Sequence, residues 1–82
     1  FVLTDPTNFF LDYRISPGDE EREVLKMEKE DDCFVLSVVT VPPDQKITLN
    51  LAAPILFSPS SNRAAQVILE TSEYQSKTSL PL

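Results

Sequence analysis

The sequence contains no histidine, and it has one cysteine and one glycine among its 82 residues. Without histidine the chain lacks the usual general base at neutral pH and the commonest metal ligand. A single cysteine, Cys33, excludes both an internal disulfide and a thiolate zinc site, and it fits a reducing, cytoplasmic location. Gly18 alone cannot form a glycine-rich phosphate loop. We therefore expect no enzyme activity, no catalytic or metal site and no cofactor.

Basic residues are also few. The chain has seven lysines and arginines against thirteen acidic residues, which gives a net charge of −6. The excess is concentrated in residues 19–32 (DEEREVLKMEKEDD), which contain eight acids and three bases. This balance disfavours nucleic acid and favours a basic protein surface as partner. The segment lacks the ligand spacing and turn glycine of a calcium loop, so a solvated helix face is the simpler interpretation.

Long apolar runs are absent too. None approaches the roughly 18 residues that a membrane span requires, and no signal peptide is visible. The length predicts one domain, residues 1–82. The chain begins at Phe1, and its first residues, FVLT, already resemble a strand. We expect a fragment that lacks the N-terminal half of its domain, with apolar surface near residues 1–15 that promotes self-association or lowers stability.

Residues 47–57 (ITLNLAAPILF) carry the clearest alternation. The apolar residues at every second position are Ile47, Leu49, Leu51, Ala53, Ile55 and Phe57. A period of two predicts a strand with one buried face, but Pro54 cannot donate to a strand ladder. Two explanations stay open: an edge strand or bulge that tolerates proline, or an edge that also meets a protein partner.

The remaining patterns predict a mainly β fold. Cys33–Val41 is apolar at both alternating sets, as expected for a strand covered on both faces, and Cys33 should then be buried and slow to react. Further strands are expected at 1–4 and 64–70, and a loose tail at 71–82. Ser16 and Pro17 predict the start of a helix over 17–27. The expected fold is a small antiparallel β-sheet or barrel-like domain with one short α-helix.

Several residues are candidates for contact with a protein partner, each beside a purely structural explanation. Phe9 belongs to the core or anchors an interface. Asn50 bonds neighbouring backbone or faces the partner. The carboxylates of the acidic segment steer a basic partner or are merely solvated. The full set is Phe9, Glu20, Glu21, Glu23, Asn50, Pro54 and Arg63.

Five segments in order resemble the flagellar assembly factor family FliW. They are Phe1–Pro6 with Phe9-Phe10 and Asp12-Tyr13; Asp31–Pro42; Thr48–Ile55; Arg63–Leu69; and Tyr74 with Pro81-Leu82. The resemblance covers essentially the whole chain but only the C-terminal part of the family's domain. The chain departs from the family pattern at Lys26, where a helix-ending glycine is frequent, at Ser58-Pro59, and at Leu80, where histidine often precedes the final Pro-Leu.

The resemblance implies an adaptor without catalysis. Such proteins bind the translational regulator CsrA, relieve its repression of flagellin messenger RNA, and bind flagellin itself. Two alternatives remain at this stage: a structural fragment with no partner-binding activity of its own, and a domain that supplies only part of an enzyme site.

Overall fold

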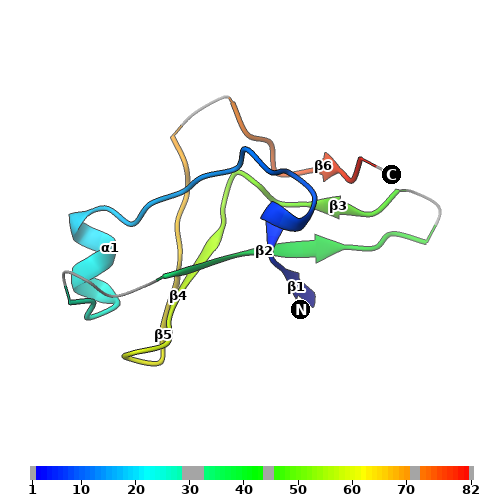
Figure 1. Cartoon of the computed structure of the whole chain (residues 1–82). Helices are drawn as coiled ribbons and strands as arrows, with labels where there is room; N and C mark the ends of the chain where they lie inside the picture. The colour runs from blue at the N-terminus through cyan, green and yellow to red at the C-terminus, as the bar shows by residue number, and fades with distance from the viewer. Residues whose placement is uncertain (1, 29–32, 44–45, 71–72, 82) are drawn as a thin grey trace.

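The computed structural model describes residues 2–28, 33–43, 46–70 and 73–81. Residues 29–32 of the acidic segment, and Phe1 of the first expected strand, therefore lie outside the described residues. Figure 1 shows an extended sheet with a short helix beside one end. The elements are β1 (Val2–Thr4), the 3-10 helix η1 (Pro6–Asn8), α1 (Asp19–Val24), β2 (Phe34–Thr40), β3 (Thr48–Leu49), β4 (Ile55–Ser58), β5 (Arg63–Gln66) and β6 (Thr78–Ser79).

All pairings in the sheet are antiparallel, and β2 is its central strand. Strand β1 pairs with β2 in the register Leu3 to Val38. Strands β3 and β4 also pair with β2, and they in turn pair with β6 and β5. The expectation of a mainly β, antiparallel fold with one short helix is confirmed. In β4, the period of two gives the strand one buried face, formed by Leu56 and Ser58.

The alternating segment 47–57 is not one strand. Val39 of β2 pairs with Leu49, whereas Leu36 pairs with Ile55. A length of three residues along β2 therefore lies opposite a length of six residues between β3 and β4. The segment that joins β3 to β4 thus contains three extra residues. This is a large bulge, the conformation that tolerates a proline. The bulge explanation of Pro54 is confirmed; the edge-strand explanation is wrong, because β4 lies between β2 and β5.

Every residue of the segment that contains the insertion, residues 50–54, has a hydrogen bond to its backbone. Asn50 Oδ1 accepts from the Ala53 N–H at 3.1 Å, and Ser37 Oγ donates to the Asn50 carbonyl at 2.9 Å. Tyr13 Oη donates to the Leu51 carbonyl at 2.7 Å. The carbonyls of Ala52, Ala53 and Pro54 accept from Leu69 N, Gln66 Nε2 and Val67 N, respectively. These bonds allow Leu51, Ala53 and Pro54 to be buried without unpaired carbonyls.

Tyr13, Leu49 and Leu51 form the main core cluster. The aromatic ring of Tyr13 is 3% exposed and packs edge-on against Tyr74, with ring centroids 4.8 Å apart. Burial raises the pKa of the Tyr13 hydroxyl to about 12. Half-buried side chains pack around the cluster: Phe9, Phe10, Ile15, Val35, Val39, Tyr74 and Leu80.

The tail is more ordered than the sequence indicated. Strand β6 pairs with β3, Tyr74 packs on Tyr13, and Leu80 packs against the core and donates its N–H to the Ile47 carbonyl. The prediction of a loose tail was wrong for the described residues 73–81. Tyr74, which the sequence already offered as an anchor for the tail, and Leu80 hold it against the core, and the residues between them have no clear period.

Strand β2 occupies the predicted place, but the described residues do not cover both of its faces. Ser37 is buried, while Phe34 is 56% exposed and Val41, just beyond the strand, is 63% exposed. Apolar composition was misleading here, because it cannot say whether a second layer exists. The exposed Val2, Leu3 and Leu11 confirm that apolar surface lies near residues 1–15.

The helix is shorter than predicted, because Gly18 rather than Ser16 is its N-cap. Glu21 Oε1 accepts the Gly18 N–H at 3.0 Å. At the other end, Met27 N bonds the Arg22 carbonyl and Lys26 N bonds the Glu23 carbonyl, which is a Schellman motif. This motif places Lys26 at φ 52°, a left-handed conformation that favours glycine.

We predict that Lys26→Gly raises the free energy of unfolding by about 0.5–1 kcal/mol, because glycine adopts the left-handed conformation without steric cost. Urea denaturation measures the change. Lys77→Gly is the control, because Lys77 is exposed and has no positive φ; it should not stabilise the chain. A destabilised Lys26→Gly variant would contradict the C-cap assignment.

Candidate protein-binding surface

A groove of about 350 Å³ separates α1 from the strand segment that begins at β5. Glu20, Glu21 and Val24 of α1 form one wall, and residues 65–68 (Ala-Gln-Val-Ile) form the other. Val24 is 54% exposed and Ile68 is 71% exposed. The groove therefore combines an apolar lining with carboxylates, a pairing that suits a protein partner better than a small polar substrate.

The short helix is held against the sheet at its C-terminal end. Leu25 is fully buried, and Ser61 Oγ of the β4–β5 turn donates to the Leu25 carbonyl. The same turn contains Asn62 at φ 56°, a left-handed position that asparagine tolerates. The burial of Leu25 and the Ser61 bond fix the groove wall relative to the β4–β5 turn.

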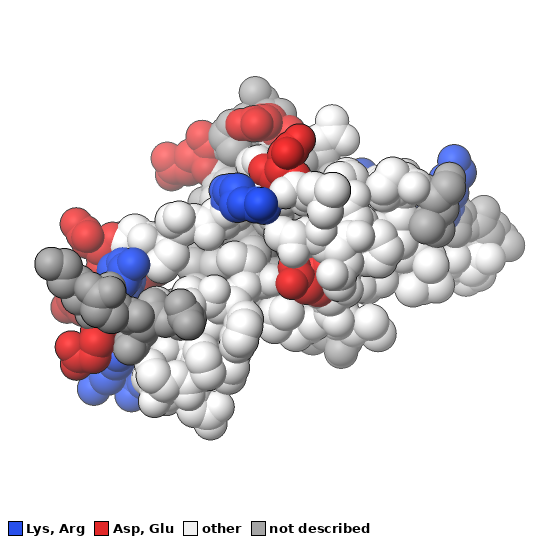
Figure 2. All heavy atoms as spheres, viewed as in Figure 1, with Lys and Arg blue, Asp and Glu red and all other residues white. Residues whose placement is uncertain are grey.

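Acidic side chains lie at the α1 end of the molecule, with basic side chains among them, and a second acidic group lies at the top of the view (Figure 2). Glu20 and Glu23 are exposed, whereas Glu21 is half-buried and caps Gly18. Glu20 and Glu21 line the groove, and Glu23 does not. The three predicted carboxylates thus occupy one helix but have different surroundings.

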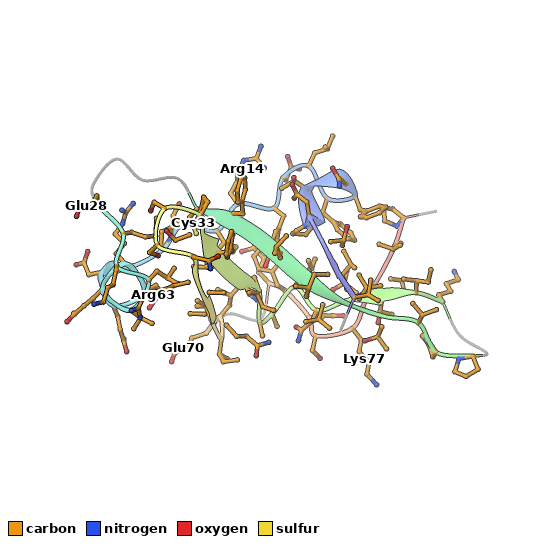
Figure 3. The ribbon with its side chains drawn as sticks, turned by 90° about the horizontal axis from the view of Figure 1, so that it is seen from below. Arg14, Glu28, Cys33, Arg63, Glu70 and Lys77 are labelled. Atoms are coloured by element: carbon orange, nitrogen blue, oxygen red, sulfur yellow. The ribbon has the colours of Figure 1, made fainter. Side chains whose placement is uncertain are left out.

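The other predicted residues do not join this groove. Phe9 ends η1 and packs against the core cluster. Asn50 and Pro54 lie in the bulge, where Asn50 bonds local backbone and Pro54 is less than 2% exposed. Arg63 is exposed at the start of β5, beside the β4–β5 turn (Figure 3). The structure brings Glu20 and Glu21 together and leaves the rest of the set dispersed.

Sequence patterns missed two further hollows. One, of about 380 Å³, is lined by Phe10, Asp12, Tyr13, Leu51 and residues 73–75 and 78. The other, of about 490 Å³, is lined by Asp5, Thr7, Leu11, Arg14 and residues 33–35. Both join segments that are distant in sequence, so no local motif could have indicated them.

Cys33 lies just before β2, in the second of these hollows and near Arg14 (Figure 3). Its side chain is half-buried rather than buried. Burial raises the pKa of the thiol, while the Phe57 backbone and Arg22 oppose that shift. The predicted deep burial was wrong, because Cys33 precedes the strand and lines a hollow at the surface.

We predict that Cys33 in the native chain reacts with a thiol reagent more slowly than glutathione near neutral pH, because its raised pKa leaves less thiolate. The reaction should nevertheless reach completion without denaturant, and it should accelerate as the pH rises towards about 9. Stopped-flow labelling tests this. A thiol that reacts as fast as glutathione, or only in denaturant, would contradict this placement.

The described residues hold no cluster of three or more cysteine, aspartate or glutamate side chains that could bind a metal ion. In the same part of the chain, no helix has the length and apolarity needed to cross a membrane.

The chain is similar in sequence to known proteins. The family model described as FliW protein matches residues 1–80. The flagellar assembly factor FliW of Syntrophotalea carbinolica is 60% identical over 81 residues, which are 99% of this chain and 58% of that protein. FliW 2 of Desulfotalea psychrophila is 63% identical over 81 residues, 99% of this chain and 54% of that protein.

A crystal structure of the flagellar assembly factor FliW has the same architecture, with a TM-score of 0.86 and 33% identity. The match covers 100% of this chain and 60% of the other. The chain thus spans a little over half the length of the relatives that it matches. These relatives are named assembly factors, a non-enzymatic class. The family model matches nearly the full length of the chain, its relatives are similar in sequence, and the solved structure has the same fold. The chain therefore belongs to the FliW family.

Proposed function

We propose that this chain, as part of a longer FliW-type domain, binds a CsrA-type RNA-binding regulator and flagellin in the cytoplasm. Binding of the regulator relieves its repression of flagellin translation, and free flagellin competes for the adaptor. Membership of a family of flagellar assembly factors supports the proposal, since synthesis and export of flagellin must be matched during assembly.

One observation carries the regulator half of the proposal: Glu20 and Glu21 line a groove with an apolar wall. An RNA-binding regulator needs a basic surface, because it neutralises phosphates. An acidic groove attracts such a surface and increases the rate of encounter, while apolar contacts slow dissociation.

A second possibility has its own support. The chain spans 54–58% of the two relatives compared, and Val2 and Leu3 of β1 are exposed. In this alternative, the chain is a structural fragment that self-associates or is less stable than the intact domain, and it has no partner-binding activity of its own. Comparing the 82-residue chain with a full-length protein in the binding assay distinguishes the adaptor proposal from this alternative.

We predict that reversing Glu20 and Glu23 to lysine in the full-length protein slows association with the regulator by about threefold to tenfold at low salt and reduces the salt dependence. Glu21 is left intact because it caps Gly18. The double reversal of Asp12 and Glu73, which changes the net charge equally, is the control. Surface-binding kinetics at two salt concentrations give both rates.

The control reversal should slow association less, because Asp12 and Glu73 line a different hollow. Equal slowing by the two reversals would leave only an effect of net charge. Failure of the intact protein to bind the regulator would reject the regulator half of the proposal. Addition of flagellin to the preformed complex tests the competition: release supports it, and an unaffected complex rejects it.

A further inference from the structure

The outer side of β5 is an open backbone edge. In the β4–β5 ladder Ile55 pairs with Gln66, and Val67 N and Leu69 N donate to the Pro54 and Ala52 carbonyls at 2.9 Å. Hydrogen-bonded and non-hydrogen-bonded pairs alternate along an antiparallel ladder. Residues 65, 67 and 69 therefore direct their backbone groups towards β4, and Ala64, Gln66 and Ile68 direct theirs away from it.

No described strand occupies that outward side, since β5 ends the order of strands in the sheet. The edge is longer than β5 itself, because the hydrogen bonds of Val67 and Leu69 continue the ladder past Gln66. An exposed row of backbone N–H and C=O groups is a template for an added strand.

The acidic groove lies along this same edge. Ala65, Gln66, Val67 and Ile68 form its strand wall, and Val24 faces them from α1. Of the described residues, two charged ones line the groove, Glu20 and Glu21, and both are acidic. A chain lying along the edge would place alternate side chains between Val24 and the strand, within the field of the two carboxylates.

We propose that an extended segment of a protein partner, with alternating apolar and lysine or arginine residues, adds as a strand along residues 64–68. Outward backbone groups of Ala64, Gln66 and Ile68 bind its main chain, Val24 and Val67 contact its apolar side chains, and Glu20 attracts its basic ones. The inference rests on the proposed function, for which it names the mode of contact with a basic partner.

Charge argues against a second copy of the chain as the occupant. Pairing of two β5 edges brings the α1 helices of both copies to the same place, and each helix contributes Asp19, Glu20, Glu21 and Glu23 against Arg22. Four acids against one base on each side repel one another. A basic segment instead neutralises these charges.

The test uses the 82-residue chain and a blocked synthetic peptide of about seven residues in which valine and lysine alternate, matching the length of an ordinary strand. Binding is measured by titration calorimetry, and the site by amide hydrogen exchange. We expect the amides of Ala64, Gln66 and Ile68 to gain protection. A peptide with glutamate in place of lysine should not bind.

Two pairs of variants isolate the contacts. Ile68→Pro removes one outward N–H without removing a bond to β4, and it should weaken peptide binding roughly fivefold to tenfold. Ile68→Thr keeps that N–H and controls for the lost side chain, so it should weaken binding less. Glu20→Lys should weaken binding more than Glu23→Lys, which makes the same charge change outside the groove. Unchanged exchange at Val67 and Leu69 verifies that each variant is folded.

Equal affinities for Ile68→Pro and Ile68→Thr, or for Glu20→Lys and Glu23→Lys, would overturn the inference. So would concentration-dependent protection of the edge amides without peptide, which would identify a second copy as the occupant. Protection of these amides within the full-length protein alone would identify its own chain as the occupant and would equally overturn it. If the regulator binds the full-length protein in the kinetic assay but the peptide fails here, the strand-addition inference fails while the proposed function stands.

Discussion

The insertion of three residues opposite β2, between Leu49 and Ile55, is the constraint on which the rest of the structure depends. It interrupts an otherwise regular antiparallel strand and requires irregular backbone to be buried, which is costly unless each polar group is bonded. Three side chains from other elements supply bonds: Tyr13 to the Leu51 carbonyl, Ser37 to the Asn50 carbonyl and Gln66 to the Ala53 carbonyl. These bonds connect the N-terminal segment, the central strand β2 and β5 to the insertion.

The insertion also determines where the groove between α1 and β5 lies. The insertion divides the chain opposite β2 into β3, which pairs with β6, and β4, which pairs with β5. Strand β5 then leaves the β4–β5 turn, whose Ser61 bonds the end of α1. The acidic helix therefore lies beside an open strand edge, and Figure 1 shows α1 near β4 and β5 and away from β3 and β6. Because of this connectivity, the acidic side chains of α1 and the backbone edge of β5 line the same groove.

The sequence predicted the strands better than their surroundings. Apolar runs located β2 and β5, the period of two located β4, and Pro54 marked the bulge, because a missing N–H is a local property. Burial of Cys33 and cover on both faces of β2 were wrong, since they depend on a second layer that no local pattern records. Of the candidate site, the charges of Glu20 and Glu21 were evident from composition. Val24 and Ile68, which complete the groove, were not evident as a pair, because they lie 44 positions apart in the sequence.

Native-state amide exchange of Asn50→Ala tests the central claim most directly, because the substitution removes the acceptor of the Ala53 N–H within the insertion. If the insertion holds β5 in place, exchange should accelerate at Ala53, Val67 and Leu69, by about tenfold for the loss of one partly buried hydrogen bond. Exchange in the β1–β2 ladder, around Leu3 and Val38, should change less. Unchanged exchange at Val67 and Leu69, or equal acceleration throughout the sheet, would contradict the claim that this insertion positions the groove.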